Sequence, residues 1–426
     1  MRKLLITLLT IAATTTIYAQ SGTNSPYSMY GVGVLNDRAS GFNRAMSGLG
    51  IALHEGNQVD YLNPASYSNM DSLTFIFDAG MTLQFTNFTS GSVKKNAKNA
   101  DFEYAVAGFR VAKHLGMSFG VLPFSNVGYS FSATDKYTDN TAHTAGSTFT
   151  TTNSGTGGLR QIYLGAGYSP FKGFSVGLNV GYIWGEYSRS IVTSYSDGYS
   201  RSGGRYYTAD AAAMRFDLGL QYTQQLDKDN SLTLGLTFSP GYKMSSTADM
   251  KEILTDPQTS VSDTAKYSLK NSIPLPTQFG VGLAWYHTTR WRVGVDYTLQ
   301  KWGSFPDYVN CIYANRDDVL LDRHKVIIGG EYVPNAQSRK YLNRIHIRAG
   351  LSYATPYINI NNEKGPKEYG ATLGFGLPIT NSWNNRSVLN ISAQYVRTDG
   401  PIKENTFRLN IGLTFNERWF QKWKVE

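Results

Sequence analysis

The chain has 426 residues, of which 41% are hydrophobic, 13% are aromatic and 17% are charged, and its formal net charge is +9. Its single cysteine, Cys311, excludes an internal disulfide framework. Lys and Arg are spread along the chain without forming a block, so nucleic-acid binding is not favoured.

The first twenty residues have the composition of a secretory signal peptide. Arg2 and Lys3 form a basic start, residues 4–17 form an apolar stretch, and Ala19 is suited to a cleavage site. No run of about eighteen apolar residues follows, so the sequence predicts no transmembrane helix. We therefore expect an exported protein without a helical anchor.

Residues 21–71 form a second unit, which is rich in Gly, Asn and Ser and does not alternate between apolar and polar side chains. It contains apolar residues that an unpacked tail would expose to water: Ile51, Leu53, Val59, Tyr61 and Leu62. We interpret this unit as a hatch, or plug, packed inside the domain that follows. The alternative interpretation is a flexible periplasmic tail.

Residues 72–415 alternate between apolar and polar side chains with a period of two, as β-strands with two different faces do. Near the C-terminus, Phe407, Leu409 and Ile411 alternate with Arg408 and Asn410. The pattern predicts about fourteen strands, an even number as bacterial barrels require. They cover residues 73–88, 101–112, 115–133, 159–170, 173–192, 206–224, 231–246, 267–287, 290–302, 320–334, 342–357, 366–380, 385–397 and 404–415.

The connections between these segments alternate between short and long. Short turns such as 113–114 and 171–172 are followed by long polar stretches such as 134–158 and 247–265. Long loops at one end only are typical of outer-membrane barrels, whereas a soluble sandwich has no reason for this alternation. The predicted fold class is therefore all-β: a transmembrane antiparallel barrel of about fourteen strands with the hatch in its lumen.

Residues 416–426 form a short periplasmic tail after the last predicted strand. The tail contains Trp419, Phe420 and Trp423. Aromatic residues of this kind anchor proteins at the membrane interface, which is the interpretation we favour. A docking site for a periplasmic partner is the alternative.

Three stretches resemble the FadL/TodX family of outer-membrane transporters for hydrophobic compounds, in the manner of Bacteroidetes-type members. The first is GLGIAL at residues 48–53, followed about ten residues later by NPAS at 63–66. The second is FGVLPFSNVGY at 119–129, and the third is the strand pair from 275 to 305. The resemblance covers nearly the whole mature chain. It implies a hatch that blocks the lumen and a sideways exit for the ligand at a kinked third strand.

Pro123 and Phe124 lie inside the predicted third strand. Proline cannot donate a ladder hydrogen bond, so Pro123 predicts a local break in strand pairing. The break corresponds either to a lateral opening or to a simple bulge. We weigh the two equally.

Further candidate site residues lie in the predicted hatch. Asn63, Pro64 and Ala65 carry the motif of the resemblance, and we expect them to shape the backbone of the hatch. Tyr27, Met29 and Tyr30 are candidates for a luminal apolar pocket or for simple packing, and His54 beside Glu55 is a candidate gating residue.

The sequence contains no pattern typical of an enzyme, a metal site or a cofactor site. The six histidines lack metal-binding spacing, and no GxSxG or phosphate-binding loop occurs. The acidic residues Asp317, Asp318 and Asp322 suggest at most a weak calcium site, and a solvated loop is the favoured interpretation.

The predicted function is passive transport of small hydrophobic molecules, such as long-chain fatty acids, across the outer membrane. The expected partners are outer-membrane lipid or lipopolysaccharide and the hydrophobic ligand. The long loops are polar, which weakens the case for capture of fatty acids. Two alternatives remain: a structural or shuttle component of a protein secretion system, with its proteins as partners, and a porin for polar solutes.

Overall fold

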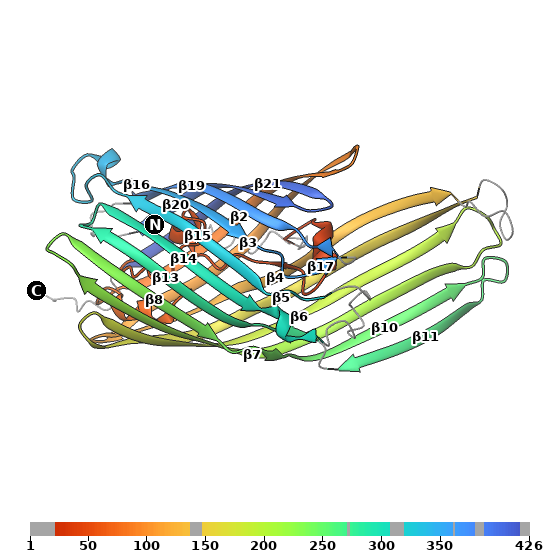
Figure 1. Cartoon of the computed structure of the whole chain (residues 1–426), viewed down its shortest axis with the longest axis horizontal. Helices are drawn as coiled ribbons and strands as arrows, with labels where there is room; N and C mark the ends of the chain where they lie inside the picture. Colours follow the sequence, from red (N-terminus) through yellow and green to blue (C-terminus); the bar gives the residue numbers. More distant parts are fainter. Residues whose placement is uncertain are drawn as a thin grey trace, which may run out of the picture.

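A ring of fourteen antiparallel β-strands forms the body of the protein in the computed structural model (Figure 1). Each strand pairs with the next along the ring, and β2 pairs with β21 to close it, so the predicted barrel is confirmed.

The structure describes residues 22–136, 147–270, 273–306, 319–360, 363–379 and 387–417. The predicted signal peptide, Cys311, Asp317, Asp318 and residues 418–426 of the tail lie outside these ranges. The ring consists of β2 (Phe75–Ser90), β3 (Val93–Ala112), β4 (Leu115–Lys136), β5 (Thr148–Phe171), β6 (Phe174–Tyr195), β7 (Ser202–Gln225), β8 (Asn230–Ser239), β13 (Thr277–His287), β14 (Trp291–Lys301), β15 (Arg323–Tyr332), β16 (His346–Ala354), β19 (Lys367–Ile379), β20 (Ser387–Asp399) and β21 (Lys403–Glu417).

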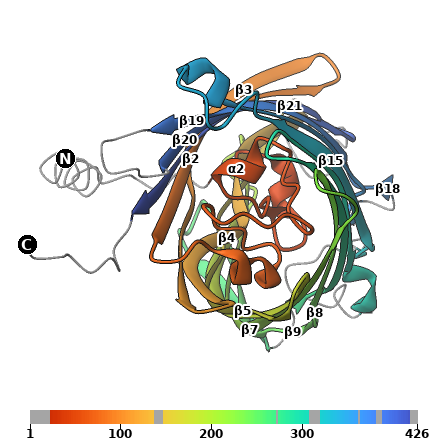
Figure 2. The ribbon, with the colours of Figure 1, turned by 90° about the vertical axis from the view of Figure 1, so that its left-hand side faces the viewer.

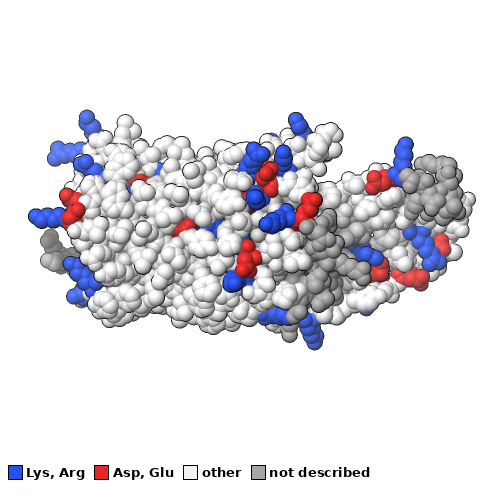
Figure 3. Space-filling model, viewed as in Figure 1, with Lys and Arg blue, Asp and Glu red and all other residues white. Residues whose placement is uncertain are grey.

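Apolar side chains point out of the ring and polar ones point into it. On β21, Phe407 is 46% exposed, whereas Asn410 and Thr414 are buried in the lumen. Figure 3 shows a largely uncharged belt between charged side chains at one end of the barrel and others near the middle of the molecule. An outward apolar belt on a closed barrel is typical of transmembrane barrels. Among the described residues, no helix is long and apolar enough to cross a membrane.

The long polar connections are not loops, as the sequence had suggested, but largely continuations of strands. Residues 247–265, for example, belong mostly to the hairpin of β10 (Ser245–Thr255) and β11 (Ser262–Lys270), and β10 pairs with the first half of β7. The far parts of β4, β5, β6 and β7 together with β10 and β11 form a sheet that projects beyond the barrel (Figure 1), which we call the outer sheet. We call the end of the molecule where the outer sheet lies the hairpin end, and the opposite end the turn end.

Residues 22–71, the luminal segment, lie inside the ring of strands (Figure 2). Phe42, Met46, Leu49 and Leu53 of this segment are almost completely buried. Its regular elements are η1 (Pro26–Met29), β1 (Val34–Leu35), α2 (Gly41–Arg44) and η2 (Pro64–Asn69). The other short elements of the chain are β9 (Tyr242–Lys243), β12 (Pro274–Leu275), β17 (Asn359–Ile360), β18 (Glu363–Lys364), η3 (Trp302–Ser304) and η5 (Tyr341–Arg344).

Glycines of the wall make room for the luminal segment. A Cβ atom on Gly235 of β8 would lie 2.0 Å from the carbonyl oxygen of Ile51, and one on Gly116 of β4 would lie 1.9 Å from that of Tyr67. These distances are far shorter than any real contact of a Cβ atom, so no larger residue fits without displacing the segment. The wall and the segment are therefore shaped to each other.

Candidate functional site

The NPAS motif fixes the luminal segment to the wall. The Asn63 side chain accepts a hydrogen bond from the Ala65 N–H at 3.1 Å and so caps η2, with Pro64 as its first residue. Its Nδ2 donates to the carbonyl of Ile51 at 2.7 Å and to that of Leu220, on β7, at 3.1 Å. Ala65 is completely buried. These contacts fix the start of η2 and tie it to the backbone of Ile51 and of β7.

Ion pairs between buried or partly buried side chains join the luminal segment to opposite sides of the barrel. Arg38 contacts Asp217 of β7 at 2.9 Å, and Lys325 of β15 contacts Asp37 at 2.6 Å. Arg44 contacts Glu103 of β3 at 3.0 Å. A buried charge is costly without its partner, so these pairs oppose any displacement of the segment.

His54 lies at a second charged cluster. Its ring packs on Tyr286 of β13 with 4.9 Å between ring centroids, and its backbone N–H donates to the Tyr286 hydroxyl at 3.1 Å. The neighbouring Glu55 contacts Arg292 of β14 at 3.1 Å. Burial, and then the Arg292 guanidinium, lowers the pKa of His54 to about 4, so the ring is neutral at pH 7.

We expect the His54 pKa to make the protein less stable in mild acid. A histidine pKa that is lower in the folded than in the unfolded chain contributes stability above about pH 6.5, and this is lost as the pH falls through 6.5 towards 4. Melting curves in detergent should show a loss of about 1–2 kcal/mol between pH 7.5 and pH 5 that His54→Gln removes. His114→Asn, at an exposed turn, is the control. Parallel pH profiles for wild type and His54→Gln would contradict the assignment.

The join between β3 and β4 is incomplete, because most of the length of both strands is not paired across it. Their ladder ends at the pair Ala105–Val121 after seven residue pairs, whereas β4 and β5 form twenty-one. Beyond this point β3 continues with β2 and β4 continues with β5, and the two hairpins separate towards the hairpin end (Figure 1). We call this separation the seam. The register of β4 against β5 shifts between Pro123 and Ser125, beside the seam.

The luminal segment covers the inner side of the seam. β1 pairs with β4 through Val34–Asn126 and Leu35–Ser125, and the Asn36 N–H donates to the carbonyl of Phe124 at 3.0 Å. On the other side, Asn24 donates to Asn99 of β3 at 2.8 Å. Across the seam itself, Asn126 donates to the carboxylate of Asp101 at 3.2 Å. A two-residue strand and a few side-chain contacts thus replace a continuous ladder here.

An apolar cluster lies beside the seam. It includes Val32, Val127, Tyr129, Leu159 and Ile183, all nearly buried. The candidates Tyr27, Met29, Tyr30 and Phe124 are only partly buried and pack against this cluster. The structure therefore brings these four together, whereas Asn63, Pro64 and Ala65 lie at η2 and His54 contacts β13. Trp302, which is fully buried in the cluster, was not among the candidates.

Comparison with solved structures finds barrels of the same architecture. The toluene transporter TodX of P. putida matches with a TM-score of 0.60 at 15% identity over 91% of this chain and all of its own. The monoaromatic hydrocarbon channel CymD matches with a TM-score of 0.58 at 14% identity over 91% and 100% of the two chains. A Pseudomonas aeruginosa FadL homologue matches with a TM-score of 0.56 at 10% identity over 90% and 98%. The expected resemblance to FadL/TodX transporters is thus confirmed for the fold.

Family comparison gives a more specific assignment. The family model described as BamG matches residues 1–426, the whole chain. The chain belongs to the BamG family. No curated protein matches it significantly. The BamG family model and the FadL-type structures match the same part of the chain, because the family model covers residues 1–426 and the TodX structure covers 91% of the chain. In the described part of this BamG-family chain, no group of His, Cys, Asp or Glu is arranged to hold a metal ion.

Proposed function

We propose that this chain is an outer-membrane barrel that passes small hydrophobic molecules passively and releases them sideways through the seam. The observation that carries the proposal is the position of the apolar cluster directly beside the seam, with Val127 and Tyr129 on β4 itself. A hydrophobic molecule on such a path, from cluster to seam to lipid, stays in contact with apolar groups and avoids the free-energy cost of entering water.

The contacts at the seam support this route. Separating two ordinary neighbours such as β13 and β14 would break a ladder of eleven residue pairs. Opening the seam requires only that β1 and a few side chains of the luminal segment leave β4. A motion that breaks few contacts costs little free energy, and gating segments are found in such low-stability parts of a fold. The names of the structural neighbours, toluene transporter and hydrocarbon channel, agree with this class of ligand.

The ligand class that we infer is small and mainly apolar, similar in character to a fatty acyl chain. Tyr27, Met29 and Tyr30 cover the cluster from the luminal segment and are only partly buried. Thioether and aromatic side chains adapt to apolar ligands of varied shape. These three residues are therefore the ones that must move when the ligand enters.

A second candidate function is that of a structural component of a protein secretion system. The outer sheet favours it, because β10 and β11 continue the sheet well past the barrel (Figure 1). Within the described residues β11 pairs with β10 alone, so its other edge is free for a partner. A permanently open porin is less compatible with a lumen in which Phe42, Met46 and Leu49 are almost completely buried.

Native mass spectrometry with lipid extraction, on protein purified in a mild detergent, tests the proposal. We expect a bound hydrophobic molecule, and we expect Val127→Asn to lose it because the change places an amide in the apolar cluster. Val93→Asn, at an exposed hairpin position, is the matched control and should retain the ligand. An empty barrel that keeps a protein partner through detergent exchange would contradict the transport function and favour the secretion component.

A further inference from the structure

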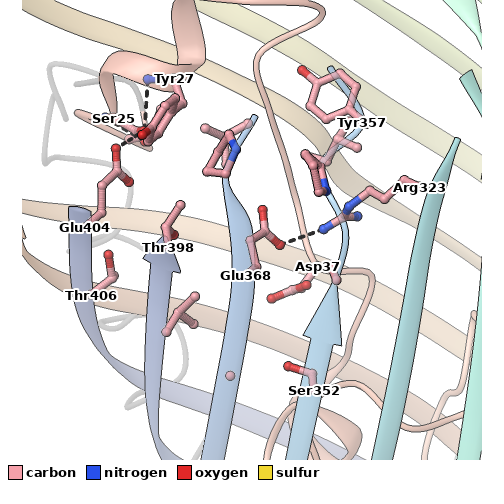
Figure 4. Close-up of a pocket in the computed structure, with 18 of the residues that line it drawn as sticks. Ser25, Tyr27, Asp37, Arg323, Ser352, Tyr357, Glu368, Thr398, Glu404 and Thr406 are labelled. Atoms are coloured by element: carbon pink, nitrogen blue, oxygen red, sulfur yellow. Dashed lines mark hydrogen bonds and ion pairs between the residues drawn. The ribbon is translucent and has the colours of Figure 1, made fainter. Parts of the chain in front are cut away.

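A polar chamber occupies the hairpin-end half of the lumen, lined mainly by β15, β16, β19, β20 and β21. Its volume is about 90 Å³, which holds roughly six waters or a small molecule. Figure 4 shows its lining: Glu404, Thr398, Glu368, Ser352 and Arg323 come from neighbouring strands, β21 to β15, and Ser25, Tyr27 and Asp37 of the luminal segment face them. The proposed hydrophobic route shares Tyr27 with this lining but uses none of the charged groups.

The charges of the chamber are only partly compensated. Arg323 pairs with Glu368 at 2.7 Å. Lys325 and Arg408 share one carboxylate, that of Asp37, at 2.6 and 3.6 Å. One positive charge is therefore in excess at this inner part of the chamber.

The opposite holds at the other end of the chamber. Glu404 is buried and accepts a hydrogen bond from the Ser25 hydroxyl at 2.6 Å. It forms no ion pair with any described residue. A buried carboxylate without a cation is costly, and a protonated amine would compensate it.

A further polar atom lacks a partner at the positive end of the chamber. Gln394 of β20, which is opposite Arg408 in the β20–β21 ladder, lines the chamber and is 4% exposed. Its Nε2 donates to Asp37 at 3.5 Å, but its Oε1 accepts no hydrogen bond from any described residue. A buried oxygen of this kind is costly to leave without a donor, so a ligand N–H or O–H group at this end of the chamber would stabilise it. An amide N–H of a ligand would satisfy it.

The positions of the charged residues on the wall limit the length of the ligand. Glu404 and Arg408 lie on the same face of β21, four residues apart, so that their Cα atoms are about 13 Å apart. We propose that the chamber binds a small zwitterion with its amine and its carboxylate at opposite ends, of which a short peptide is the natural example. The amine contacts Glu404, the carboxylate contacts Lys325 and Arg408, and the amide N–H nearest the carboxylate contacts Gln394, which is opposite Arg408. An extended tripeptide spans about 10 Å, which fits between these groups.

Isothermal titration of the full-length protein with three probes tests the proposal. Triglycine has both terminal charges, N-acetyl-triglycine lacks the amine charge, and triglycine amide lacks the carboxylate charge. Triglycine should bind at least about tenfold more tightly than either blocked peptide, because each buried charged contact is worth more than 1.4 kcal/mol. Equal binding of the three probes, or no binding, would overturn the proposal.

Two substitutions give a readout that a merely structural change would not produce. Glu404→Gln should abolish the preference for triglycine over N-acetyl-triglycine, and Lys325→Met should weaken the preference over triglycine amide. Glu252→Gln, at a partly exposed pair with Arg205 on the outer sheet, should change neither preference. Unchanged preferences in both chamber variants would overturn the proposal. If neither variant folds, the three probes on the wild-type protein still decide it.

Discussion

Replacing Gly235 with leucine is expected to open the barrel to ions. The backbone of Ile51 lies so close to Gly235 that even a Cβ atom would approach its carbonyl oxygen to 2.0 Å and the Cα of Ala52 to 3.0 Å. Four added carbon atoms cannot fit, and the β8 backbone is held by β7 and β13 on its two sides. The luminal segment must therefore move, because it is joined to the wall by side chains and not by a continuous ladder.

Conductance across a planar bilayer measures this effect. The wild-type protein should show a closed baseline, and Gly235→Leu should show steady currents, because an interior of about fourteen strands is wide enough for water once its contents are displaced. Gly177→Leu should act in the same way, since a Cβ there would lie 2.3 Å from the backbone of Pro64. Gly198→Leu is the control, because nothing lies within 4 Å of its Cβ position. Closed channels in both luminal variants, with unchanged melting, would contradict the close fit.

Replacing Glu331 with alanine is expected to give the largest loss of stability among single substitutions in the wall. Glu331 of β15 is buried and accepts from Arg292 and Arg348 at 2.5 Å each, and it lies 3.1 Å from His346. Arg348 is fully buried. Removing the acid leaves the fully buried Arg348 guanidinium without a carboxylate, whereas Arg292 keeps Glu55, and the loss of the Arg348 pair costs about 3–5 kcal/mol.

Unfolding in detergent, followed by the heat-dependent shift of the folded band on gels, measures this loss. Glu331→Gln should lose less than Glu331→Ala, because the amide oxygen still accepts a hydrogen bond. Glu252→Ala is the matched control, because its partner Arg205 is 57% exposed, and it should cost less than about 1 kcal/mol. A loss of that small size for Glu331→Ala would show that the cluster is hydrated and not dry.

The sequence predicted the barrel well because a strand between lipid and lumen must alternate. Phe407, which faces outward, and Asn410, which faces the lumen, illustrate this alternation on β21. The regularly spaced apolar side chains mark the barrel strands in a single sequence, without any alignment. The outer sheet was missed because both of its faces meet water, so no apolar face marks its strands. Cross-strand pairs of hydroxyl groups join its strands instead, such as Ser132 with Thr152 and Thr134 with Thr150, each at 2.9 Å. Polar residues of this kind produce no alternation in hydropathy along the sequence.

The candidate site was only partly predictable. Pro123 indicated a disturbed third strand, and the register shift of β4 lies there. The pairing of Val34 with Asn126 joins residues 92 positions apart, and no local pattern reveals such a contact. The inward charges Asp217 and Glu331 follow from the alternation of their strands, but their partners depend on the three-dimensional arrangement.

A covalent cross-link across the seam tests the proposed route most directly. Asp101 and Asn126 contact each other across it at 3.2 Å, so Asp101→Cys with Asn126→Cys, in a Cys311→Ser background, can be joined by a short reducible dithiol linker. Thr223→Cys with Thr233→Cys bridges an ordinary join, between β7 and β8, and serves as the control. Uptake of a radiolabelled long-chain fatty acid is then measured in a Gram-negative host that lacks its own transporter. The proposed function predicts that bridging the seam stops uptake, that reduction restores it, and that the control bridge has no effect; undiminished uptake through a bridged seam would contradict lateral release.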